Sequence, residues 1–263
     1  MTFYDISPIV IISHRRSGTH WSIDTIRNNL VGVGSEYYNL DRIQKKNKYH
    51  LSIDEFMGNV EKCNGIPVLK SHMASDFTPF SGDEKQFVQD LLANSKIIYI
   101  YRDGRDVLTS LYYYMAKFEP NLPSFSQFLK MKENFNSTYV NLNRVEYWNE
   151  HVSGWTKNDD FDVCTISYED LFYRYNKTVH ILADFLNIPI APDGVRKVDL
   201  QKPNLIEKIM NKMNVYSLPS SAIAPRKGVV GDWMNCFSEE DLDFFNSIAT
   251  ELMVELNYYK QNR

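Results

Sequence analysis

The sequence predicts an α/β fold in which a central parallel sheet is flanked by helices. Three observations indicate it. Short apolar runs recur along the chain, longer stretches of helical periodicity separate them, and polar residues follow each run and open the next helix. Strands that alternate with helices form parallel sheets, because a crossover helix returns the chain to start the next strand in the same direction.

Four runs of β-branched and apolar residues predict buried strands, and we expect a sheet of four or five strands. The runs cover residues 8–13, 66–70, 96–101 and 162–167. The chain between residues 35 and 65 is polar and includes the basic run at residues 45–48. We interpret that run as part of a solvated loop rather than a binding surface.

Helical periodicity or helix start and stop signals predict eight helices. They cover residues 18–30, 81–94, 104–117, 124–132, 141–157, 168–186, 203–213 and 238–256. Ser81, with Glu84 three residues later, predicts a capping box. Trp148 and Trp155 stand at helical spacing with other apolar residues, which is typical of core positions.

Composition limits the classes of protein that the chain can represent. Its 263 residues fit one domain, residues 1–263, and its net charge of −4 argues against a nucleic-acid partner. Three scattered cysteines predict reduced thiols rather than disulfides or a zinc site. No signal peptide and no apolar run of membrane-spanning length is evident, so we expect a cytoplasmic protein without a membrane partner.

Two polar turns after predicted strands combine cationic side chains with the backbone N–H groups of a helix start, at residues 14–21 and 101–110. Such turns hold phosphate, so two of them predict a ligand with two separated anionic groups. The first turn lacks the Gly-Lys-Ser/Thr ending of a P-loop, because Thr19 follows Gly18 and the cation is Arg16. An anionic nucleotide bound without a metal ion is therefore favoured over a magnesium triphosphate.

Other chemistry-bearing residues also follow predicted strands. His72 follows the second, Arg102 the third and Tyr168 the fourth. The carboxyl ends of parallel strands meet at one edge of a sheet, where ligands bind in this class of fold. We therefore expect these residues and the first turn to form one site.

Three segments, in order, resemble those of a known family, the cytosolic-type sulfotransferases. Residues 16–21 resemble the family's 5′-phosphosulfate loop, residues 101–110 its 3′-phosphate motif, and residues 226–233 its carboxyl-terminal Arg-Lys-Gly…Gly-Asp-Trp signature. The resemblance extends from about residue 9 to residue 237. It implies a P-loop-like sulfotransferase fold and transfer of a sulfuryl group from 3′-phosphoadenosine 5′-phosphosulfate (PAPS) to a hydroxyl or amine of a small-molecule acceptor, without a metal.

The resemblance also implies roles for individual residues. His72 would be the general base, and Lys70 and Arg16 would stabilise developing charge. A histidine suits this role because its ordinary pKa of about 6.5 lies near working pH. The late loop at residues 217–231 would order over the nucleotide. The residues expected to contact the nucleotide are Arg16, Ser17, Gly18, Thr19, His20, Trp21, Arg102, Ser110, Tyr168, Arg226, Lys227 and Gly228.

The chain departs from the family pattern at three places. Arg16 stands where the family has lysine, which keeps the charge but changes the geometry toward the leaving group. Arg15 stands where proline often faces the acceptor, and this favours a polar or anionic acceptor. The family's short dimer motif is not preserved after residue 234, so the oligomeric state stays open.

Competing interpretations remain for several residues. His14 and His20 are rivals to His72, although His20 better fits a phosphate contact or packing. We interpret three other histidines and one ion pair as surface features: His50, His151, His180, and Arg105 with Asp106. The alternative functions are a P-loop-type small-molecule kinase and a non-catalytic nucleotide-binding relative. Magnesium-dependent turnover of ATP would identify the first, and formation of a sulfated product would exclude the second.

Overall fold

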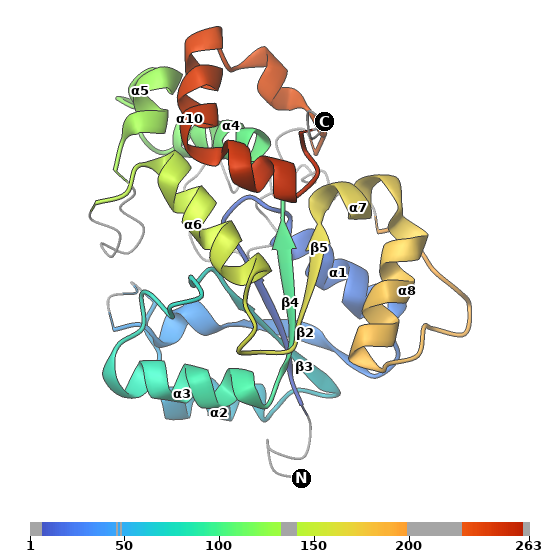
Figure 1. Cartoon of the computed structure of the whole chain (residues 1–263). Coiled ribbons are helices and arrows are strands. Elements are labelled where there is room, and N and C mark those ends of the chain that lie inside the picture. The colour runs from blue at the N-terminus through green and yellow to red at the C-terminus, as the bar shows by residue number, and fades with distance from the viewer. Residues whose placement is uncertain (1–6, 46, 48, 133–140, 199–227, 260–263) are drawn as a thin grey trace.

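The computed structural model describes residues 7–45, 47, 49–132, 141–198 and 228–259. Within them, five parallel strands form one sheet in the order β2-β3-β1-β4-β5. Helices cover both faces of the sheet, with α1, α7 and α8 together on one side (Figure 1). The predicted α/β class is confirmed.

The strands are β1 (Ile9–Ser13), β2 (Val33–Asn39), β3 (Ile66–Ser71), β4 (Lys96–Tyr101) and β5 (Val163–Ser167). Four of them match the predicted strands to within one residue. The sequence interpretation missed β2, most of which lies in the stretch taken as a polar loop. This strand forms one edge of the sheet and is mostly only partly buried, so its residues lack the continuous apolar run of a central strand.

The helices match the predicted ones in most cases, but the polar stretch also holds η2 (Leu40–Ile43) and α2 (Ile53–Val60). The others up to β5 are α1 (Thr19–Asn29), α3 (Gly82–Ala93), α4 (Gly104–Met115), α5 (Phe125–Lys130) and α6 (Arg144–Thr156). After β5 follow α7 (Tyr168–Tyr173), α8 (Tyr175–Leu186), η5 (Asp232–Asn235) and α10 (Glu239–Glu255).

Two predictions about helices are wrong. The single helix expected over residues 168–186 is broken at Arg174, whose φ of −130° and ψ of 36° are not helical. Neither glycine nor proline marks that break in the sequence. The capping box at Ser81 does not form, because its side chain accepts no cap hydrogen bond, and Glu84 is buried instead. The helix predicted over residues 203–213 lies outside the described residues.

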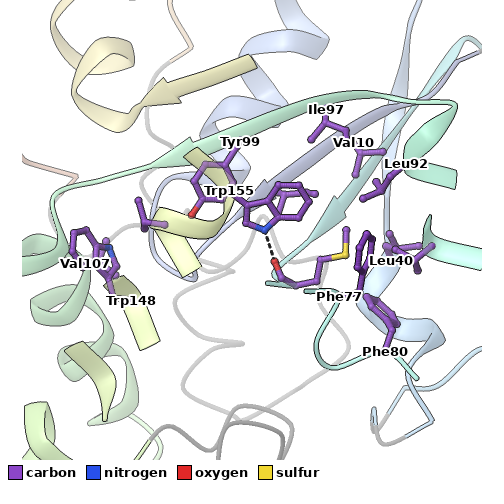
Figure 2. Close-up of a cluster of buried hydrophobic side chains, with 14 of the residues drawn as sticks. Val10, Leu40, Phe77, Phe80, Leu92, Ile97, Tyr99, Val107, Trp148 and Trp155 are labelled. Carbon is purple, nitrogen blue, oxygen red and sulfur yellow. Dashed lines mark hydrogen bonds between the residues drawn. The ribbon is translucent and has the colours of Figure 1, made fainter. Parts of the chain in front are cut away.

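The sheet separates two apolar clusters, and alternate residues of each strand enter opposite clusters. In β1, Ile9 and Ile11 pack toward α1 and α8, whereas Val10 and Ile12 pack on the other side. Figure 2 shows part of the second cluster, with Val10 near Ile97 and the ring of Trp155 beside Tyr99.

The two tryptophans of α6 are core residues, as predicted. Both Trp148 and Trp155 are fully buried, and the indole N–H of Trp155 donates to the Met73 carbonyl at 2.9 Å (Figure 2). The three cysteines are free thiols. Among the helices that the structure describes, none has the length and apolar character needed to cross a bilayer.

Candidate active site

The carboxyl ends of β1, β3, β4 and β5 lie along one edge of the sheet. The register pairs Ile12 of β1 with Ser71 of β3, and it pairs Tyr101 of β4 with Ser167 of β5. The turns that follow these strands therefore begin at nearly the same level. Helices α1, α4 and α7 start at this edge. The strand register therefore brings the predicted site residues of the described part of the chain to the same edge.

The first turn lies between β1 and α1 and has an unusual backbone. Arg16 has a φ of 70° and Gly18 a φ of 100°, so two left-handed residues flank Ser17. A side chain at Gly18 would not fit, because a Cβ there would lie 2.6 Å from the Tyr168 ring. This conformation leads into the N-terminus of α1 at Thr19, where unpaired helical N–H groups favour an anion.

Ser17 indicates independently that this turn binds a polar ligand. The residue is fully buried, and its hydroxyl oxygen has no hydrogen-bond partner among the described residues. A buried hydroxyl without a partner costs about 1–3 kcal/mol, so such groups are normally satisfied. An anionic oxygen held in the turn would accept its hydrogen bond.

Arg16 connects the first turn to helix α4. Its Nε donates to Ser110 Oγ at 3.1 Å, and its guanidinium lies 4.9 Å from the centre of the Tyr114 ring. Desolvation of the neighbouring His20, followed by the charges of Lys70 and Arg16, lowers the pKa of its ring to about 3. His20 is therefore neutral at neutral pH.

His72 follows β3 and is held by the end of β1. Its Nδ1 lies 2.8 Å from the Ser13 carbonyl, which can only accept, so Nδ1 carries the proton and Nε2 the lone pair. Desolvation, followed by the charge of Lys70, holds the pKa of His72 well below its ordinary value. The residue is partly exposed, and its ring is in the neutral form that a general base requires.

Ser13 joins this histidine to the first turn. Its hydroxyl forms a buried hydrogen bond of 2.6 Å with Thr19 Oγ1, while its carbonyl accepts from His72. The sequence interpretation did not single out Ser13. Its position as the last residue of a buried strand, directly before the turn, could have identified it as a candidate site residue.

Asp41 is a second residue that the sequence interpretation missed. It is buried in η2, and its Oδ1 accepts from Ser71 Oγ at 2.6 Å and from the His72 amide at 3.1 Å. Asp41 therefore fixes the backbone that presents His72. It also opposes the effect of burial on Lys70, whose pKa burial lowers. No sequence motif marks it, because the polar stretch around it gave no strand or helix signal.

Two further histidines pack behind His72. The interpretation of His151 as a surface residue is wrong, since only 1% of it is exposed. Tyr99 donates to its Nδ1 at 3.0 Å, and its Nε2 donates to the His72 carbonyl at 3.3 Å. Desolvation is the main cause that lowers its pKa to about 4. The ring of His14 lies 5.4 Å from that of His151. His50 and His180 are exposed, as predicted.

A second cationic centre lies at the start of α4. Arg102 is buried, its guanidinium lies 4.3 Å from the centre of the Tyr168 ring, and one of its nitrogens donates to the Val229 carbonyl at 2.7 Å. Trp21 packs on the same tyrosine, with ring centres 5.1 Å apart. Gly228 precedes Val229 and so lies beside this centre.

The remaining late-loop predictions concern Arg226, Lys227 and the rest of residues 217–227, all of which lie outside the described residues. The prediction that Arg105 and Asp106 form an exposed pair is wrong. Arg105 is 8% exposed and pairs with Asp103 at 2.6 Å, and Asp106 is 1% exposed. Both face the carboxyl-terminal segment, which a reading of neighbouring residues alone could not reveal.

Within the described part of the chain, no cluster of three His, Cys, Asp or Glu side chains is placed to hold a metal ion. The two centres contain the cationic side chains of Arg16 and Arg102. Arg16 spans between them through Ser110, and His72 lies beside the first with Lys70. Such an arrangement can hold two anionic groups next to a neutral base.

Comparison with known proteins identifies the family. A family model described as “Sulfotransferase domain” matches residues 7–257. Sulfotransferase 2B1 of Mus musculus is 26% identical over 258 residues, which cover 93% of this chain and 71% of that protein. Since the family match spans nearly the whole chain, the chain belongs to the sulfotransferase family and is a sulfotransferase.

Solved structures agree on the fold. Mouse sulfotransferase SULT7A1 complexed with PAP aligns with a TM-score of 0.64 at 22% identity, over 97% of this chain and 88% of that one. Retinol dehydratase in complex with androsterone and the inactive cofactor PAP aligns with a TM-score of 0.61 at 17% identity, over 97% of this chain and 83% of that one. The sheet described above is therefore the sulfotransferase fold.

Proposed function

We propose that this sulfotransferase moves a sulfuryl group from PAPS to a hydroxyl or amine of a small-molecule acceptor, with His72 as the general base. The observation that supports this most strongly is the hydrogen bond of 2.8 Å from His72 Nδ1 to the Ser13 carbonyl. It fixes the tautomer whose Nε2 can take a proton, directly beside the first anion-binding turn.

The residues of both centres suit the two anionic ends of PAPS. Ser17 Oγ in the first centre and Arg102 Nε in the second are buried and lack partners among the described residues. Each can donate to an anionic oxygen. Ser17, Gly18 and Thr19 would hold the 5′-phosphosulfate, and Arg102 with Ser110 would hold the 3′-phosphate. The relatives crystallised with PAP, which is adenosine 3′,5′-bisphosphate, support the same donor.

PAPS supplies an activated sulfuryl group when it is bound. The chain's part is to align the acceptor, remove its proton and stabilise charge on the leaving oxygen. His72 Nε2 would take the proton. Arg16 and Lys70 would face the leaving side, and the burial of Lys70 strengthens its field because little water screens it.

A cationic group lies near the proposed base. The charge of Arg15 contributes to lowering the pKa of three histidines, His14, His72 and His151, so it lies near the base. A cation beside the reacting hydroxyl favours an acceptor that carries polar or anionic groups. The complex of retinol dehydratase with androsterone supports a small-molecule acceptor in general.

A transfer assay with labelled donor tests the proposal. Wild-type protein is incubated with [³⁵S]PAPS and a panel of phenols, aliphatic alcohols, amines and their carboxylated analogues. We expect a labelled product with at least one acceptor and a loss of roughly 10²–10⁴-fold in the transfer rate for His72→Ala. His50→Ala, at an exposed position, is the matched control.

The competing functions give different results. The variant must still bind PAP, because His72 acts on the acceptor rather than on the nucleotide. Full activity in His72→Ala would refute its role as base. Absence of transfer to the whole panel, with tight PAP binding, would support the binding-only alternative, and magnesium-dependent consumption of ATP would support the kinase alternative.

A further inference from the structure

We propose that Asp106 is a positioning residue that assembles the 3′-phosphate site from two parts of the chain that lie far apart in sequence. It orients Arg102 from helix α4 and holds the carboxyl-terminal segment at Gly231 and Trp233. The inference rests on the proposed function, because the ligand of this site is the 3′-phosphate of PAPS.

Asp106 uses both carboxylate oxygens to bind the carboxyl-terminal segment. Its Oδ2 accepts from the Gly231 amide at 2.7 Å, and its Oδ1 accepts from the Trp233 amide at 3.0 Å. The residue is 1% exposed, so little water competes for these hydrogen bonds. Hydrogen bonds to a charged acceptor are about twice as strong as neutral ones. The carboxylate therefore fixes the segment on the first turn of α4.

The same carboxylate contacts the arginine expected to bind phosphate. Asp106 Oδ2 lies 3.4 Å from a terminal nitrogen of Arg102, and that nitrogen donates to the Val229 carbonyl at 2.7 Å. The guanidinium is thus held between α4, the late segment and the Tyr168 ring. Its Nε is buried and has no partner among the described residues. A terminal nitrogen of the guanidinium is therefore held by protein groups, whereas its Nε can donate to a ligand.

Asp106 must contribute to phosphate binding by holding other groups in place, because its own negative charge opposes the binding of an anion. A buried carboxylate near a phosphate is repulsive, so it would weaken binding if it acted through its charge alone. The two backbone amides keep this carboxylate satisfied when Arg102 turns its donors to the phosphate. An asparagine of the same shape would place an NH₂ group against one of the amide donors, and it would release Gly231 or Trp233.

The contribution of the 3′-phosphate to affinity tests this role. Calorimetric titrations give the dissociation constants for adenosine 3′,5′-bisphosphate and for adenosine 5′-monophosphate, which lacks the 3′-phosphate. The ratio of the dissociation constant for adenosine 5′-monophosphate to that for adenosine 3′,5′-bisphosphate measures how much the 3′-phosphate contributes to affinity. We expect Asp106→Asn to reduce the ratio by about tenfold or more, because a charge-assisted hydrogen bond to the phosphate is lost or misplaced. A purely structural role would weaken both nucleotides alike and leave the ratio unchanged.

Asp103→Asn is the matched control. Asp103 is also buried at the start of α4, but its carboxylate pairs with Arg105 and not with Arg102. We expect its ratio to stay within about twofold of the wild-type value. Circular dichroism and thermal melts establish that each variant is folded. If Asp106→Asn fails to fold, Asp106→Ser keeps one acceptor for an amide and serves the same test.

The outcomes separate the inference from the proposed function. A folded Asp106 variant that keeps the wild-type ratio would overturn the inference and leave the donor assignment intact. An equal fall in the ratio for Asp103→Asn would also overturn it, because the effect would then be general to the helix start. A wild-type ratio near one would overturn the assignment of the donor itself.

Discussion

The two proposed anion-binding centres of this sulfotransferase are built in different ways. The first, at the turn between β1 and α1, consists of consecutive residues with a special backbone, at Arg16 and Gly18. The second consists of residues that lie 127 positions apart, Arg102 and Val229, brought together at α4. A local centre is specified by a short motif, whereas an assembled centre depends on tertiary contacts such as those of Asp106.

The first centre should be the more sensitive to a single backbone change. Gly18→Ala places a methyl group 2.6 Å from the Tyr168 ring at a φ of 100°. We expect at least ~100-fold weaker binding of adenosine 3′,5′-bisphosphate, because displacement of the turn removes about two charge-assisted N–H contacts. Titration calorimetry measures the change.

Gly32→Ala is the control for this prediction. Gly32 also has a positive φ, of 75°, but a Cβ there would meet nothing within 4 Å. Gly32→Ala carries a similar backbone cost of about 1–2 kcal/mol beyond the end of α1, so it shows whether a positive-φ alanine outside the turn changes nucleotide affinity. Nucleotide affinity in Gly18→Ala that matches that of the control would contradict the local design of the first centre.

Neutral histidines lie next to the first centre, and two of them, His14 and His151, are buried, which should make the protein sensitive to acid. Burial holds the pKa of His151 at about 4 and that of His14 and His72 well below the ordinary value. The unfolded chain takes up these protons near pH 6.5, and the folded chain only at lower pH. The free energy of unfolding therefore falls as pH drops from about 6.5 toward 4.

Chemical denaturation at a series of pH values measures this loss. Removing one such histidine in His151→Gln should reduce the slope by up to about 1.4 kcal/mol per pH unit in this window, or about 3 kcal/mol in total. His180→Gln, at an exposed position, is the matched control. Equal slopes for the wild type and His151→Gln would show that the buried ring does not stay neutral.

A smaller effect is expected where the two centres meet. Ser110→Ala removes the acceptor of the Arg16 Nε hydrogen bond of 3.1 Å. Because the guanidinium is charged, loss of this hydrogen bond corresponds to roughly a tenfold change in affinity. Because Arg16 belongs to the first centre, adenosine 5′-monophosphate should also bind more weakly, unlike in the Asp106 variants.

The exposed Ser247→Ala on α10 provides the comparison for Ser110→Ala. A loss confined to the 3′-phosphate would show that Ser110 serves the second centre alone. A loss for both nucleotides would show that Arg16 couples the centres.

The contrast between the centres also explains what the sequence could predict. The central strands and most helices follow from apolar runs and periodicity, so β1, β3, β4 and β5 were predicted closely. The edge strand β2 was missed because its partly exposed residues carry no such run. The break at Arg174 was missed because a helix can end there without glycine or proline.

The candidate site also contains residues that the sequence could indicate and residues that it could not. His72, Arg16 and Gly18 could be proposed as site residues because each closely follows a predicted strand, and their roles stay proposals. Asp41, Asp106 and His151 were missed or misplaced, because each acts through a partner from another element. No local pattern in the sequence records such partners, so only the folded arrangement reveals them.

A crystal structure of this chain with adenosine 3′,5′-bisphosphate would test most directly whether one nucleotide is held at both ends. We expect the 5′-phosphate within about 3 Å of the amides at Gly18 and Thr19, and the 3′-phosphate within about 3 Å of Arg102 and Ser110. A nucleotide whose 3′-phosphate lies away from Arg102, or whose 5′-phosphate lies outside the first turn, would contradict it.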